Sequence, residues 1–203
     1  ITGASAEIAP ADKKLYALRD VTATVPSIPL ITASIMSKKL AESLDALVLD
    51  VKFGSGAFMK SLDQARKLAQ SLVDTGKRMG VKTAALLTDM NQPLGRMAGN
   101  VVEIHESIAT LRGEGPADLW ECTRELGMEM LLMTGRAAGR EVAHRMLETE
   151  ISSGRALAKF REMVGAQGGD LDRLPHPGET HYIGLEWPGV IHSIDTERLG
   201  IAI

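Results

Sequence analysis

The chain has 203 residues and a hydrophobic content of 44%, which is enough to bury the core of one large domain, or of one medium domain and part of another. Its formal net charge is −3, with acids and bases interspersed, and it has only two Trp, two Tyr and three Phe. It therefore offers neither the basic surface nor the stacking platform that nucleic-acid binding requires. No apolar run approaches the roughly 20 residues of a membrane span, so we predict neither a nucleic-acid nor a membrane partner.

Cysteine usage points to a reducing compartment. The single cysteine, Cys122, permits no disulfide framework, and we predict a cytoplasmic protein. Glu121 and Glu125 flank this thiol at short range, and acidic neighbours raise a thiol pKa. Cys122 is therefore a poor candidate for a nucleophile.

The first informative segment spans residues 14–44. We expect Pro29 and the residues just before it to be extended, and residues 32–44 to form a helix. The expected buried face consists of Ala33, Met36, Ser37, Leu40, Ala41 and Leu44. Ser34 and Lys38 lie one turn apart on an adjoining face, where, with Arg19, they suit a planar polar ligand. Spacing by itself favours the simpler alternative, in which these charged side chains face water.

The next segment predicts a strand, a helix and a second strand. Residues 46–51 and 81–88 are short apolar runs, and residues 61–79 between them have a helical period. Ser61 and Gln64 form a capping-box pattern, and Gly80 is placed to end the helix. Two buried strands joined by an amphipathic helix favour a parallel pair.

The middle of the chain is predicted to be helical. Asn100 and Glu103 repeat the capping pattern before a helix that reaches Leu111, and Pro116 suits the first turn of a helix running to Met133. Two further helices are expected over residues 139–151 and 155–164. The fold class is therefore α/β, with a central, mainly parallel sheet flanked by helices.

Composition changes near residue 165, where turn-forming residues cluster. We predict part of an α/β domain with associated helices over residues 1–165, a linker over 166–178, and the start of a truncated C-terminal α+β domain over 179–203. Residues 181–195 have a β-type composition. The first residue is Ile1 rather than Met and the last residues are apolar, so we expect both ends to be cut.

Four segments together resemble the pyrimidine nucleoside phosphorylase and thymidine phosphorylase family: residues 14–22, 27–40, 50–59 and 88–95. Residues 189–200 resemble the opening of that family's C-terminal domain. The resemblance implies a homodimeric glycosyltransferase of nucleoside salvage. Such an enzyme uses inorganic phosphate to split thymidine, uridine or deoxyuridine into a free base and a (deoxy)ribose 1-phosphate, and it has an α-helical domain and a larger α/β domain.

The resemblance also implies a base-binding site. Arg19 and Lys38 would be catalytic and, with Ser34, would bind the pyrimidine, while Tyr16 and Ile31 would line its pocket. Breaking the glycosidic bond leaves electrons on the base, so donors aimed at its carbonyls stabilise a charge that grows in the transition state.

The same resemblance implies a monovalent cation site and a phosphate site. Leu94 and Met97 would bind a cation such as K⁺ through backbone carbonyls and Glu106 through its carboxylate, because a hard cation prefers oxygen. A lone helical glutamate such as Glu106 is otherwise usually solvated. No organic cofactor is implied. The glycine-rich phosphate loop is expected upstream of Ile1, and we interpret Gly54 and Gly56 as a structural turn rather than an anion cradle.

Two alternatives stay open. An anthranilate-type phosphoribosyltransferase resembles these enzymes in architecture, although residues 14–22 fit the phosphorylase pattern. A fragment that binds a base without catalysis is the other. Preference between thymidine and uridine does not follow from the sequence.

Overall fold

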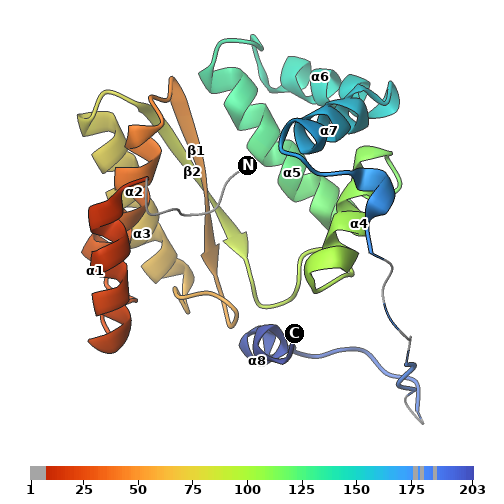
Figure 1. The fold of residues 1–203 in the computed structure, drawn as a ribbon, viewed down its shortest axis with the longest axis horizontal. Helices are drawn as coiled ribbons and strands as arrows, with labels where there is room; N and C mark the ends of the chain where they lie inside the picture. Colours follow the sequence, from red (N-terminus) through yellow and green to blue (C-terminus); the bar gives the residue numbers. More distant parts are fainter. Residues whose placement is uncertain (1–7, 176–177, 179–180, 185–186) are drawn as a thin grey trace.

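The computed structural model describes residues 8–175, 178, 181–184 and 187–203, which form a layered α/β arrangement (Figure 1). Helices α2 (Ile28–Ala41) and α3 (Leu62–Arg78) cover one side of a small sheet, and α1 (Pro10–Val21) lies outside α2. Helix α5 (Ala117–Met133) covers the other side. The predicted fold class is confirmed.

The sheet consists of β1 (Ala46–Phe53) and β2 (Lys82–Asp89), which pair in parallel. Ala46 is paired with Lys82 and Phe53 with Asp89, so the strands are in register along their whole length. Alternate residues point to opposite faces, which places Leu47 and Val51 in the core below α2 and α3. The predicted strand, helix, strand unit is confirmed, although β1 ends two residues later than expected and β2 is shifted by one residue.

Helix α3 begins and ends where the sequence predicts. The Ser61 hydroxyl accepts a hydrogen bond from the Gln64 amide at 3.3 Å, and the Gln64 side chain accepts one from the Ser61 amide. Gly80 follows the helix with a φ of +79°, a conformation that suits glycine. The apolar face of α3 packs into the main core. The buried residues of this core are Met36, Leu47, Val51, Met59, Ala65, Leu68, Ala69 and Leu72.

Gly76 lets α3 approach β2 closely, and this gives a testable prediction. A Cβ atom at Gly76 would lie 2.0 Å from the Thr83 hydroxyl oxygen and 2.8 Å from its Cβ. We expect Gly76→Ala to lower the free energy of unfolding by about 1–3 kcal/mol, because this overpacks a buried contact. Urea denaturation measures the change.

The matched control is Gly165→Ala in α7 (Arg155–Ala166), where nothing lies within 4 Å of the added methyl group. Since alanine is the better helix former, this variant should be up to about 1 kcal/mol more stable than the wild type. Equal losses in the two variants would contradict a packing role for Gly76.

The helix expected over residues 32–44 begins earlier than predicted, at Ile28. Ile28 and Pro29 belong to the first turn of α2, and a separate helix, α1, occupies Pro10–Val21. Proline is tolerated in a first turn because its missing N–H needs no partner there and its φ already suits a helix. Pro10 and Pro29 both lie at such helix starts.

The buried face of α2 also differs in part from the prediction. The helix ends at Ala41 rather than at the predicted Leu44, which packs against the core from beyond the helix. Met36 is buried and Leu40 packs against the core, but Ala33, Ser37 and Ala41 are exposed. Thr32 and Ser34 are buried instead. The Thr32 hydroxyl lies 2.9 Å from that of Ser71 on α3, so a hydrogen bond satisfies a polar side chain that an apolar pattern would place outside.

The predicted helices of the middle segment are confirmed as α4 (Asn100–Leu111), α5, α6 (Arg140–Ser152) and α7. The start of α4 differs from the prediction, because Gly99 is its N-cap and the Glu103 carboxylate accepts a hydrogen bond from the Gly99 amide at 2.9 Å. Pro116 is the N-cap of α5 rather than a residue of its first turn, and the bounds of α6 and α7 shift by one or two residues. A smaller core between α5 and α6 contains Met128, Ala137 and Ala143. Within the described residues, no helix has the length and apolar character needed to cross a membrane.

The C-terminal segment departs from its expected β structure. After a short 3₁₀ helix (Leu171–Arg173), residues 181–184 and 187–195 contain no strand, and α8 (Thr196–Ala202) follows. A strand needs a partner for its backbone groups, and these described residues pair with none. Residues 176–177, 179–180 and 185–186, in the predicted linker and C-terminal domain, lie outside the described residues. The domain boundaries stay predictions.

Candidate functional site

The residues of the predicted base site line one cavity of about 230 Å³, formed mainly by α1 and α2. Its lining consists of Tyr16, Arg19, Val25, Ile31, Ser34, Ile35, Lys38 and Phe58. Tyr16 and Arg19 lie three residues apart on α1, and Ser34 and Lys38 lie four apart on α2. These spacings place each pair on one helix face. The structure therefore brings together all five predicted base-site residues.

Arg19 is a buried and rigidly held cation, with only 6% of its surface exposed. One terminal nitrogen donates to the Leu30 carbonyl at 3.2 Å and the other to the Val25 carbonyl. The guanidinium carbon lies 5.3 Å from the centre of the Tyr16 ring, within cation–π range. Arg19 Nε is buried without a hydrogen-bond partner among the described residues. The desolvation of this donor is therefore not compensated by any described residue.

Lys38 is held by two neighbours at the same cavity. Its ammonium donates to Asp12 Oδ2 at 2.6 Å and to Ser34 Oγ at 3.0 Å. Burial raises the pKa of Asp12, but the hydrogen bonds from Lys38 and Ser34 outweigh this effect and hold that pKa below its usual value. The carboxylate is therefore charged beside Lys38 at neutral pH.

Asp12 was missed by the sequence analysis. Asp12, Tyr16 and Arg19 recur at i, i+4 and i+7, which is one face of a helix. Because residues before Pro29 were expected to be extended, this periodicity was not used. Pro10, at the first turn of α1, was the available signal for the helix.

The apolar wall of the cavity contains three further residues that were not predicted: Val25, Ile35 and Phe58. Ile35 follows Ile31 by one turn, so the helical period could have predicted that both side chains lie on the same wall. Phe58 comes from the loop after β1, and no local pattern relates it to α1 or α2. Its position depends on how the loop folds back over the end of the sheet.

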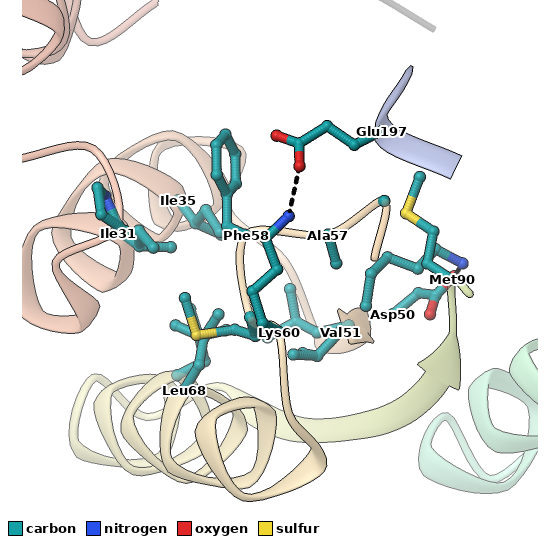
Figure 2. A pocket seen from close by; sticks show the side chains of 16 residues that line it. Ile31, Ile35, Asp50, Val51, Ala57, Phe58, Lys60, Leu68, Met90 and Glu197 are labelled. Carbon is teal, nitrogen blue, oxygen red and sulfur yellow. Dashed lines mark hydrogen bonds and ion pairs between the residues drawn. The ribbon is translucent and has the colours of Figure 1, made fainter. Parts of the chain in front are cut away.

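A larger cavity of about 630 Å³ adjoins the first and shares Ile31, Ile35 and Phe58 with it (Figure 2). It extends past the carboxyl ends of the strands to Met90, and the ion pair of Lys60 with Glu197, 3.0 Å long, lies at its edge. Ligands of α/β proteins commonly bind beyond the carboxyl ends of strands. The small cavity therefore lies beside a larger space at the ends of the strands.

The loop from Gly54 to Gly56 is a structural turn, as predicted. The Gly54 amide donates to Met59, the Ser55 amide to Asn91, and the Gly56 amide to Met90, all at 2.9–3.0 Å. The φ of Gly54 is +118°, which explains the glycine. Because these three amides already have acceptors, the turn presents no free N–H cradle for an anion.

Glu106 is buried, with 8% of its surface exposed, which argues against the alternative of a solvated side chain. Its carboxylate accepts hydrogen bonds from the Arg96 amide at 2.9 Å and the Met97 amide at 3.3 Å. A Cβ atom at Gly95 would lie 2.3 Å from Glu106 Oε2. The carboxylate is thus brought against the loop that contains Leu94 and Met97, whose side chains are exposed.

Cys122 lies on α5, outside both cavities just described. Burial, together with the charge of Asp50, raises the pKa of its thiol. A raised pKa disfavours the thiolate, which supports the prediction that Cys122 is a poor nucleophile.

Comparison with known proteins identifies the a/b domain of the glycosyl transferase family over residues 1–157. The pyrimidine-nucleoside phosphorylase of Staphylococcus aureus (strain USA300) is 52% identical over 177 residues, which are 87% of this chain and 41% of the relative. That of Geobacillus stearothermophilus is 52% identical over 179 residues, 88% of this chain and 41% of the relative. The chain therefore spans about two fifths of the length of these curated relatives.

Proposed function

The chain belongs to the glycosyl transferase family with this a/b domain, and from that premise we propose that it forms the pyrimidine-binding part of a pyrimidine-nucleoside phosphorylase. The proposed reaction is the reversible phosphorolysis of thymidine, uridine or deoxyuridine to a free base and a (deoxy)ribose 1-phosphate. The observation that carries the proposal is the single cavity that gathers Arg19, Ser34 and Lys38 with their apolar wall.

In this reaction the bond between the sugar carbon and the base nitrogen breaks, and its electron pair stays on the base. A phosphate oxygen forms the new bond to the sugar carbon, which becomes oxocarbenium-like, and over the whole reaction the released base gains the proton that the phosphate loses. Arg19 and Lys38 are suited to stabilise the negative charge that develops on the base. Both are already held by hydrogen bonds, so little reorganisation is needed as the charge develops.

The names of the relatives favour this function over the anthranilate-type phosphoribosyltransferase, which no observation supports. We assign no phosphate-binding role to the described residues. The other alternative is a protein that binds a base without catalysis. It differs from the proposed function in predicting no release of thymine that depends on phosphate.

Four finer predictions accompany the proposal. The K⁺ site is supported by the position of the buried Glu106 carboxylate beside the loop that contains Leu94 and Met97. Carboxylate and backbone carbonyl oxygens are the ligands that a hard cation prefers. Cytoplasmic location is supported by the single free cysteine. Homodimer formation and a role in nucleoside salvage rest on the family alone.

The experiment has two parts. Calorimetric titration of this chain with thymine should show binding, with adenine as the control ligand that should not bind. The full-length protein should then release thymine from thymidine only when inorganic phosphate is present. Thymine binding without phosphate-dependent release would favour the non-catalytic alternative, and failure of both parts would overturn the proposal.

A further inference from the structure

Asp12 holds a cavity residue without lining the cavity itself. Its carboxylate lies 2.6 Å from the Lys38 ammonium, and the side chains of Asp12 and Lys38 are only 14% and 25% exposed. Lys38 and Ser34 both line the cavity, whereas Asp12 does not. Asp12 can therefore act on a ligand in this cavity through the groups that it contacts and through its charge, but not by direct contact.

The hydrogen bonds of the Lys38 ammonium leave one N–H donor for a ligand. Lys38 has three N–H donors, of which one is given to Asp12 and one to Ser34. The third is available for a carbonyl of a bound base. A free lysine side chain samples many rotamers, and two fixed acceptors restrict it to one of them.

The charges of the site support the same arrangement. Arg19 and Lys38 bring two positive charges to one small cavity, and the Asp12 carboxylate offsets one of them. A net charge near +1 remains for a departing base that carries −1. Asp12 also lies in the first turn of α1, where the helix dipole favours a negative charge.

We propose that Asp12 is a positioning residue, which holds the Lys38 ammonium beside Ser34 so that its remaining donor addresses the carbonyl of a pyrimidine. This inference rests on the proposed function, because it concerns the same base site. It adds to that site a residue that acts through Lys38 rather than on the ligand.

A double-mutant cycle on this chain tests the inference, with thymine affinity measured by calorimetry. We expect Asp12→Asn to weaken thymine binding about tenfold or more, since a charged hydrogen bond that orders Lys38 is lost. In a Lys38→Met background the same change should have almost no further effect. Asp12→Glu, which retains the carboxylate, should recover part of the affinity.

The matched control is Asp20→Asn, which removes a carboxylate from an exposed position of the same helix and should leave the affinity unchanged. Unfolding midpoints of all variants show whether each one folds, and Asp12→Ser replaces Asp12→Asn if that variant does not fold. If wild-type chain fails to bind thymine, the proposed function fails. If it binds and Asp12→Asn binds equally well, or if the two losses add, the positioning role is overturned.

Discussion

Replacement of Arg19 by methionine is expected to weaken thymine binding about a hundredfold or more. Arg19 supplies a buried, fixed positive charge at the cavity, and its guanidinium has further N–H donors beyond those given to the Leu30 and Val25 carbonyls. Hydrogen bonds to charged groups each contribute about 1.5–3 kcal/mol, and 1.4 kcal/mol corresponds to a factor of ten. Loss of the guanidinium removes both the charge and its forked geometry, which methionine cannot replace.

Calorimetric titration with thymine measures this loss. The matched control is Lys14→Met, which removes a positive charge from an exposed position of the same helix and should leave affinity unchanged. Because Arg19 also binds the Leu30 and Val25 carbonyls, thermal unfolding of the variant is measured in parallel. A folded Arg19→Met variant that binds thymine within about threefold of wild type would contradict the assigned role.

Replacement of Leu72 by alanine is expected to lower the free energy of unfolding by about 2–5 kcal/mol. Leu72 is 1% exposed and lies in the core that α3 forms with α2 and the sheet. Truncation leaves a cavity in tightly packed surroundings, and the lost contacts add to the lost transfer free energy. Since α2 carries Ser34 and Lys38, the same change should also loosen one wall of the base cavity.

Urea denaturation gives the free-energy change for this variant. Leu15→Ala on α1 is the matched control, because Leu15 is 60% exposed and its truncation should alter stability by less than about 0.5 kcal/mol. If Leu72→Ala were as stable as Leu15→Ala, the packing described for this core would be wrong.

Local patterns were sufficient for much of the fold. The Ser61–Gln64 capping box and Gly80 bound α3 as expected, and the flanking apolar runs pair in parallel. These features depend on residues close together in the chain, so the sequence carries their signals directly. The sequence did not predict the start of α2 or the helix α1, because proline fits both an extended chain and the first turn of a helix.

The candidate site was also predicted only in part from the sequence. Tyr16, Arg19, Ile31, Ser34 and Lys38 were named from the resemblance, and the structure gathers them around one cavity. Their types and helical spacing also made a ligand site physically reasonable, but spacing could not separate it from a solvated surface. The cavity and the burial of Arg19 supply that distinction.

By itself, the sequence determined the α/β class, the parallel strand pair, the helices around it and the residue types of the base site. Only the tertiary structure placed Asp12 against Lys38, Phe58 over the cavity and Glu106 beneath the Leu94–Met97 loop. The physical reason is that helix and strand periods depend on neighbours a few residues apart. Burial and partner choice depend instead on side chains that meet only when separate elements pack together.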